Sequence, residues 1–308
     1  MDSHVNVVHK LVGIRMVVRP GESIGTSQFD TIRELEPTEF DVFMKATEYL
    51  RQFASRQSVH LMVERNYVAL RQILEEAVQE FTATQKVPEH LVANGGFEVN
   101  RHLMNFLSSF LSFLDHSETH LDHEDASGTW KQRFKGCRHA FFDTVFAYRF
   151  LYGLRNYVQH CGLPLGGIHA SAWRDQQGNV QTEFQVYLAR DGLLQWPKWR
   201  SDVRTSLKEQ PKEIKIMPLV EELMGCIRCL NKINLTWEME HGLREAVQRL
   251  GPAMEEILTV RMDVAPALVS EPDQFTDPMD VQVCLFPMPE LREAFALIAG
   301  DAGQALQS

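Results

Sequence analysis

Apolar residues recur every three or four positions through most of the chain between residues 37 and 161, and this spacing decides the fold class. Helical spacing covers residues from about 39 to 54, 57 to 82, 97 to 120 and 130 to 161. In the third of these segments the apolar stripe is Val99, Leu103, Phe106, Phe110 and Leu114. Glycine and proline residues within 162–167 end the last helix. We predict a mostly α protein with a central antiparallel helical bundle.

Shorter patterns on both sides of this helical region predict a small mixed β element on its flank. Apolar residues alternate at positions 12, 14, 16 and 18 and precede a turn-rich segment at 19–28, which indicates a strand or hairpin followed by a loop. Residues 168–173 and 180–188 flank the turn sequence Asp-Gln-Gln-Gly-Asn, which predicts a hairpin.

The C-terminal part of the chain is predicted to be helical again. Helical spacing covers residues from about 196 to 260 with interruptions near Pro211 and Pro218, and a short strand at 281–285 precedes a final helix. The predicted division is an N-terminal β and loop extension at 1–36, a helical core at 37–165, and a β-hairpin plus C-terminal helical region at 166–308, packed on the core.

The composition is that of a soluble globular protein. The chain has 308 residues, of which 44% are hydrophobic and 23% charged, and no run approaches the roughly 20 apolar residues that cross a bilayer. The N-terminus lacks the charged start and apolar centre of a signal peptide. We therefore expect a cytoplasmic protein with no membrane contact. Five cysteines at irregular spacing predict reduced thiols rather than a disulfide framework.

The charge is unevenly distributed. The net charge of −10 argues against a protein that coats nucleic acid through bulk electrostatics. Between residues 130 and 160, however, six lysines and arginines stand against one acidic residue, Asp143. A local basic helix suits a ligand that carries phosphate. The alternative is a basic face that only meets solvent.

Polar side chains continue two aromatic stripes near the end of the segment 130–161. The first stripe is Phe141, Val145, Tyr148 and Tyr152, followed by Arg155 and Gln159; the second is Phe142, Phe146, Arg149 and Gly153, followed by Asn156 and His160. Burying such groups without partners would cost several kcal/mol, at about 2–7 kcal/mol each, so they face a cleft, a partner chain or each other. The alternative is a cation that binds the last carbonyls of its own helix.

Spacing limits which of these groups can meet. On an ideal helix Asn156 and His160 share a face, whereas Arg155 and His160 point roughly 140° apart.

The helix expected at 97–120 also has a narrow polar face, formed by Asn105, Ser109, Ser112 and His116. This face either allows another helix to approach closely or is the solvent side of an amphipathic helix.

The string Leu-Arg-Asn-Tyr-Val-Gln-His-Cys-Gly-Leu-Pro-Leu at residues 154–165 resembles the signature of the HEPN superfamily of helical domains. Its ribonuclease members carry arginine, four to six residues and then histidine, which here are Arg155 and His160, with the polar Asn156 after the arginine. Arg133 and His139 satisfy the bare spacing too. The fuller string and the preceding segment at 100–116 are similar to HEPN proteins of bacterial defence and toxin systems. The resemblance covers residues 100–167.

The resemblance implies a metal-independent endoribonuclease that needs no cofactor. Cleavage of single-stranded RNA by its 2′-hydroxyl needs a base, an acid and positive charge on the phosphorane. Histidine transfers protons near neutral pH, and the arginine fork matches phosphate oxygens. The implied catalytic residues are Arg155, Asn156 and His160, with Gln159, Asn105, Ser109 and Arg149 binding substrate or supporting them. HEPN nucleases are expected to be homodimers with a composite site, and toxins of this type have an antitoxin or sensor partner.

Two other function classes fit the same residues. One is a non-catalytic module of this fold in which Arg155 and His160 hold a nucleotide or a protein. The other is a scaffold protein in which these polar side chains form the interface of a dimer.

Three further signals in the sequence have simpler explanations than a functional site. His116, His120 and His123 have zinc-like spacing, but an acidic, frayed helix end explains them without a metal, and we predict none. Cys226 and Cys229 are predicted to be core thiols. Trp196 and Trp199 either stack on bases or pin a loop to the core.

Overall fold

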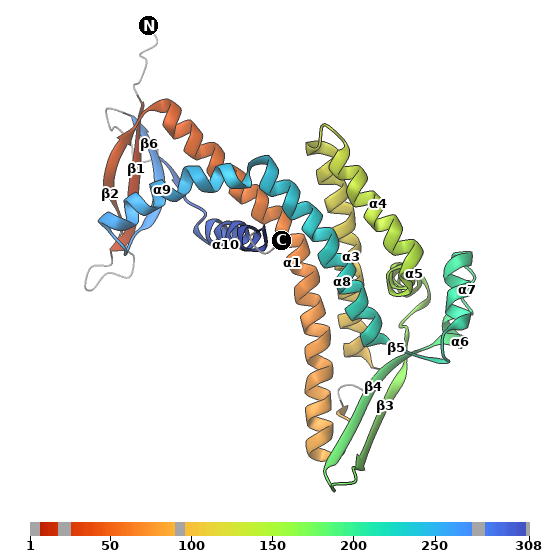
Figure 1. Ribbon diagram of the computed structural model, residues 1–308. Coiled ribbons are helices and arrows are strands. Elements are labelled where there is room, and N and C mark those ends of the chain that lie inside the picture. The colour runs from red at the N-terminus through yellow and green to blue at the C-terminus, as the bar shows by residue number, and fades with distance from the viewer. Residues whose placement is uncertain (1–6, 18–25, 90–95, 273–280, 306–308) are drawn as a thin grey trace. The chain divides into compact units, whose positions relative to one another are not determined.

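The protein is mostly helical and carries two small antiparallel sheets (Figure 1). The computed structural model describes residues 7–17, 26–89, 96–272 and 281–305, the last five by their backbone alone. Its helices are α1 (Pro37–Thr84), α3 (Phe97–Glu124), α4 (Thr129–Thr144), α5 (Phe146–Cys161), α6 (Arg190–Leu193), α7 (Ser201–Glu209), α8 (Ile216–Glu238), α9 (Arg244–Val260) and α10 (Met288–Ala305), with the π-helical segment η2 (Met239–Leu243) between α8 and α9. The prediction of a mostly α fold with flanking β elements is confirmed.

The chain forms two compact units, which divide it differently from the three predicted segments. The first unit contains residues 1–55 and 236–308, and the second contains residues 56–235. Both termini of the chain therefore belong to one unit, and the central region forms the other. None of the helices in the described residues is long and apolar enough to cross a membrane.

The first unit is built around a four-stranded sheet in the order β2-β1-β6-β7. Its strands are β1 (Val7–Val17), β2 (Thr26–Leu35), β6 (Ala265–Pro272) and β7 (Gln282–Leu285). The strand predicted near residues 12–18 and the short strand near 281–285 are confirmed, whereas β2 begins at Thr26, inside the segment predicted as a loop. The sequence prediction missed β6, which pairs with β1 antiparallel and buries Ala267, Leu268 and Val269. Burial on successive positions removes the alternation that identifies a strand in the sequence.

Helix α1 runs without a break from Pro37 to Thr84, where the sequence predicted two helices. Residues 55–57 contain neither proline nor glycine, so nothing in the backbone chemistry ends the helix there. Residues 37–55 of this helix belong to the first unit, where Leu50 and Phe53 are fully buried. Residues 56–84 belong to the second unit, where Val63 and Leu70 are fully buried.

The second unit packs α3, α4 and α5 with the rest of α1 and most of α8 around an aromatic core. Phe106 and Phe110 of α3 are fully buried. The Phe110 ring lies 5.4 Å from Tyr148 and 6.4 Å from Tyr152 of α5, edge-on in both contacts. The apolar stripe predicted for the segment 97–120 is therefore the face on which α5 packs.

The long helix predicted over 130–161 is wrong, because the chain breaks at Val145. Val145 has an extended backbone (φ −105°, ψ 111°) and separates α4 from α5. Thr144 and Val145 are both β-branched, which lowers helix propensity at this point. Arg149 compensates for the break by donating to the carbonyl oxygens of Asp143 at 3.1 Å and Phe142 at 3.5 Å.

A three-stranded antiparallel sheet, β3-β4-β5, completes the second unit. Strands β3 (Leu165–Arg174) and β4 (Val180–Ala189) confirm the predicted hairpin, and β5 is Glu213–Lys215. The interruption predicted at Pro211 falls between α7 and β5. Pro218 instead lies in the first turn of α8, where a missing N–H costs no helical hydrogen bond.

A half-buried histidine of the second unit, His60, predicts a pH dependence of stability. His60 of α1 lies edge-on to Phe113 at 5.6 Å. Burial lowers the pKa of His60, and Glu64 and Arg228 act on it in opposite directions. Because the unfolded chain binds this proton near pH 6.5, the free energy of unfolding falls as the pH drops through about 6.5 to the lower pKa of the folded state.

We expect His60→Gln to remove this part of the pH dependence. Urea unfolding of wild type and variant at about pH 7.5 and 5.5 measures it. The wild type should lose more free energy of unfolding over this interval than the variant, and His116→Gln, at an exposed position, should behave as wild type. Equal losses in wild type and His60→Gln would contradict the prediction.

Candidate functional site

The C-terminal half of α5 carries the residues that the sequence singled out. Leu151, Leu154 and Val158 of this helix are buried, at spacings of three and four that define its inner face. Gly162 ends the helix with a φ of +126°, which is a region that favours glycine. The polar residues of the motif consequently lie on the two flanks of α5, beside the buried face.

Arg155 lies on one flank, and its guanidinium is oriented by two amide side chains. Its Nη1 donates to the Oε1 of Gln159 and, at 3.4 Å, to the Oδ1 of Asn156. The side chain is half-buried, and its Nε is buried without a hydrogen-bond partner among the described residues. The structure therefore brings Arg155, Asn156 and Gln159 together. The two amide side chains hold the guanidinium in one position on the helix surface.

His160 lies on the other flank and is exposed to solvent. It makes no hydrogen bond, ion pair or ring contact with any residue that the structure describes. Because α5 stays helical to Cys161, Arg155 and His160 point roughly 140° apart. One copy of the chain does not bring these two side chains together. The Asn156 side chain bonds to Arg155 and not to His160.

The polar face of α3 takes no part in this arrangement within the described residues. Ser109 is buried and donates from Oγ to the carbonyl of Phe106 in its own helix at 2.9 Å. Asn105 is exposed, and its backbone carbonyl accepts a 3.3 Å hydrogen bond from Nδ2 of Asn66. The predicted support of the site by Asn105 and Ser109 stays a prediction.

Helix α3 contributes a different residue, Asn100, which the sequence prediction missed. Asn100 is fully buried. Its Nδ2 donates to the carbonyl of Gly96 at 3.1 Å, and its Oδ1 accepts from the backbone N–H of Leu165 at 3.2 Å. It thereby fixes the chain just after α5 against the start of α3. The sequence signal that could have identified Asn100 is an amide side chain directly after Val99 of the apolar stripe.

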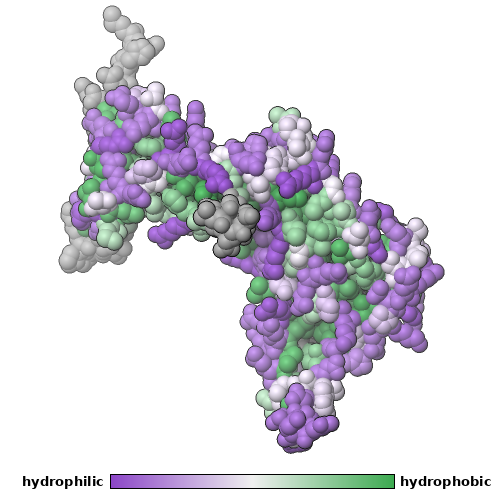
Figure 2. Space-filling model, viewed as in Figure 1, coloured by the Kyte–Doolittle hydropathy of each residue, from purple (hydrophilic) through white to green (hydrophobic). Residues whose placement is uncertain are grey.

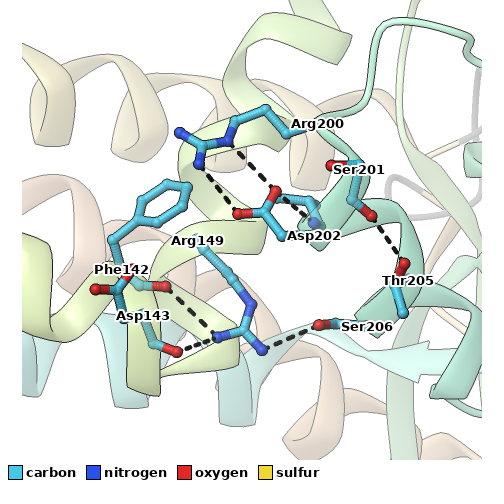
Figure 3. A network of polar contacts seen from close by, with 9 residues as sticks. Phe142, Asp143, Arg149, Arg200, Ser201, Asp202, Thr205 and Ser206 are labelled. Atoms are coloured by element: carbon cyan, nitrogen blue, oxygen red, sulfur yellow. Dashed lines mark hydrogen bonds and ion pairs between the residues drawn. The ribbon is translucent and has the colours of Figure 1, made fainter.

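Arg149 belongs to a separate polar network at the start of α5 (Figure 3). Besides its bonds to the end of α4, its Nη2 donates to Oγ of Ser206 in α7 at 3.0 Å. In the same network Arg200 lies 4.4 Å above the Phe142 ring and bonds to Asp202. Arg149 precedes Arg155 by six residues, about 9 Å along the helix axis. Its donors bind α4 and α7, and a contact with substrate stays a prediction.

Two of the basic residues in the segment 130–160 are neutralised by α3. Lys131 pairs with Asp122, and Arg138 pairs with Glu118. The local positive charge therefore serves in part to hold α4 against the acidic end of α3. For Lys131 and Arg138, these ion pairs replace both expectations, a phosphate ligand and a face that only meets solvent. Arg155 is not part of these pairs.

The loop between α6 and α7 packs its tryptophan Trp199 onto α5. Trp199 is buried, and its Nε1 donates to the carbonyl of Leu193 at 2.7 Å. A Cβ atom at Gly153 would lie only 2.8 Å from Cζ3 of Trp199. The glycine therefore allows the indole to lie directly on the helix. The prediction that this tryptophan pins the loop to the core is confirmed.

We expect Gly153→Ala to destabilise the protein by about 1–2 kcal/mol. Overpacking against Trp199 costs about 1–3 kcal/mol, and better helix propensity offsets only about 0.5–1 kcal/mol of it. The matched control is Gly136→Ala on α4, where no heavy atom lies within 4 Å of the added Cβ. That variant should gain about 0.5–1 kcal/mol from helix propensity alone. Urea denaturation measures both, and equal stabilities for the two variants would contradict the packing argument.

Metal and thiol signals do not form a site in the described residues. No group of three or more His, Cys, Asp and Glu side chains there is placed to hold a metal ion. All five cysteines are free thiols. Cys226 is buried as predicted, whereas Cys229 is exposed, which corrects the prediction of two core thiols.

A cavity of about 600 Å³ lies between α1, β4, β5 and the start of α8 in the second unit. Leu74, Phe184 and Val186 contribute its apolar wall, and Figure 2 shows apolar residues in this part of the molecule. Its charged lining residues are Arg71, Lys215, Glu75 and Glu221. Because two are basic and two acidic, the lining selects neither an anionic nor a cationic ligand.

The candidate site is thus the end of α5, with an oriented guanidinium on one flank and an exposed imidazole on the other. Asn100 and the α6–α7 loop hold this end of the helix in place. No family model, no curated protein and no solved structure matches this chain.

Proposed function

We propose that the protein is an endoribonuclease that cleaves single-stranded RNA at a site formed by the α5 ends of two copies of the chain. One observation carries the proposal: the guanidinium of Arg155 is held by Gln159 and Asn156, on the same helix as the solvent-exposed imidazole of His160. These two side chains can supply the proton transfer and the positive charge that phosphodiester cleavage by a 2′-hydroxyl needs. The activity belongs in the cytoplasm, where its substrate is.

Arg155 stabilises the charge that develops on the phosphorane. A guanidinium already oriented by two amide oxygens retains other N–H donors for phosphate oxygens, and its planar fork matches them in pairs. Orientation before binding matters, because the donors then need not reorganise when charge develops. Asn156 and Gln159 act here as positioning residues for the guanidinium.

His160 moves the protons, and its position explains why two copies are needed. One imidazole cannot both accept the 2′-hydroxyl proton and donate to the leaving 5′-oxygen in a single displacement. Arg155 and His160 also lie on different flanks of one helix. A twofold axis that brings two α5 ends together supplies a second imidazole and sets each histidine beside the arginine of the other copy.

The test is cleavage of a single-stranded RNA by the purified chain in excess chelator. The proposed mechanism leaves a 2′,3′-cyclic phosphate on one product and a 5′-hydroxyl on the other. An otherwise identical oligonucleotide with 2′-deoxyribose at the cleaved position should resist cleavage completely, because the nucleophile is absent. Cleavage of the deoxy substrate at the same bond, or loss of activity in chelator, would overturn the proposal.

In its biological setting we propose that the nuclease acts as a toxin or antiphage effector held in check by an antitoxin or sensor protein. Expression of the wild type should slow host growth, and expression of His160→Ala should not. Binding of RNA or nucleotide without cleavage would instead favour a non-catalytic binding module in which Arg155 and His160 hold the ligand.

A further inference from the structure

The loop between α6 and α7 presents a second tryptophan, Trp196, whose surroundings differ from those of Trp199. Trp199 is stacked between two rings, with Phe150 at 5.8 Å and 23° and Tyr157 at 5.9 Å and 10°. Trp196 is nearly perpendicular to its neighbours, at 85° to Tyr157 and 84° to Trp199. Neither ring is parallel to the Trp196 indole, so neither makes a stacked contact with it.

Trp196 is only half-buried, and its backbone is held on both sides. Its N–H donates to the carbonyl of Leu193 at 3.2 Å, and its own carbonyl accepts from Nη1 of Arg204 at 3.2 Å. The indole is therefore a rigid aromatic surface that keeps part of its area open. Such a surface loses little conformational entropy when a further ring stacks on it.

Tyr157 places this surface beside the histidine flank of the candidate site. The Tyr157 and Trp196 ring centroids are 5.7 Å apart. Tyr157 precedes His160 by three residues, so the two side chains are neighbours on α5, with Cβ atoms about 5–6 Å apart. Trp196, Tyr157 and His160 all belong to the second unit.

Lys198 adds a positive charge to the same loop. It is exposed and makes no ion pair or hydrogen bond within the described part of the chain. The next cation along, Arg200, is bonded to Asp202 and lies over the Phe142 ring. The loop thus carries an available ammonium group two residues after an open indole, which is the combination that binds the phosphate and base of a single strand.

We propose that Trp196 is a stacking platform for one unpaired base next to the scissile phosphate, with Lys198 neutralising the adjoining phosphate. This rests on the proposed function and refines it, because it selects single strands over duplexes: a paired base has no free face for an indole. Base stacking tolerates any base, so the platform contributes affinity without sequence preference.

The test measures RNA binding by full-length chains that carry His160→Ala, so that cleavage does not interfere. The probe is a fluorescent single-stranded RNA of about twelve nucleotides followed by anisotropy. Adding Trp196→Ala should weaken binding about 5- to 150-fold, whereas Trp196→Phe should keep it within about 3-fold. The matched control is Trp173→Ala, which removes a tryptophan that is 50% exposed on β3 and should leave binding unchanged.

Two further measurements separate stacking from general loss of charge or fold. The first uses a series of RNAs that each lack one base. At one position the missing base should weaken binding, and at that position Trp196→Ala should weaken binding no further. Lys198→Gln should reduce the slope of the logarithm of the affinity against the logarithm of the salt concentration by about 0.7. Its effect should not depend on the position of the abasic nucleotide. The inference fails if Trp196→Ala binds like Trp173→Ala, even when His160→Ala abolishes cleavage. If no variant binds RNA, the proposed function fails with it.

Discussion

Replacing His160 with alanine is expected to lower the rate of RNA cleavage at least about 100-fold, the lower limit for loss of a general acid or base. The substitution removes the only imidazole on this flank of α5 in the described residues, and it shortens an exposed side chain without described partners. The fold and the proposed dimer should therefore persist. Initial rates on single-stranded RNA in chelator measure the effect, with circular dichroism and light scattering as checks.

His139→Ala is the matched control for this loss. His139 is exposed on α4 and follows Arg133 at a spacing that also satisfies the bare arginine–histidine pattern. It lies outside the site, so its variant should keep wild-type activity. Equal losses for both variants, or full activity of His160→Ala, would remove the catalytic role of His160.

A mixing experiment tests whether the site needs two copies. In an equal mixture of wild-type and His160→Ala chains that exchange freely, about one quarter of the dimers carry two intact histidines. Activity should then fall to about one quarter of that of the wild type alone. A site complete within one chain would retain about one half, which contradicts the composite site while leaving the nuclease intact.

Phe110→Ala is expected to give the largest loss of stability, about 3–5 kcal/mol. Phe110 is fully buried and lies edge-on to Tyr148 and Tyr152, so truncation removes apolar contacts and leaves a cavity between α3 and α5. Urea unfolding followed by circular dichroism measures the change in the second unit. Phe110→Leu should recover more than half of the loss.

Phe97→Ala is the control on the same helix. Phe97 is 49% exposed at the start of α3, so its truncation should cost less than about 1 kcal/mol. Comparable losses at the two positions would mean that the buried face of α3 does not hold α5.

The sequence predicted those parts of the structure that depend on local chemistry. The period of the apolar residues placed α3 and the end of α5, and the glycine and proline at 162–164 ended α5 where predicted. The turn around Gly178 placed the β3–β4 hairpin. The angular separation of Arg155 and His160 also follows from spacing alone, because a helix fixes the direction of every side chain along it.

Only the tertiary structure decided where partners far apart in the chain would meet. At the break at Val145, Arg149 donates to carbonyls of Phe142 and Asp143, and its second bond, to Ser206, depends on the packing of α7. The role of Asn100 depends on a backbone N–H that lies 65 residues away, at Leu165. Local patterns determine helices, strands and their faces, whereas a long-range hydrogen bond or ring contact depends on the packing of whole elements, which no short stretch of sequence encodes.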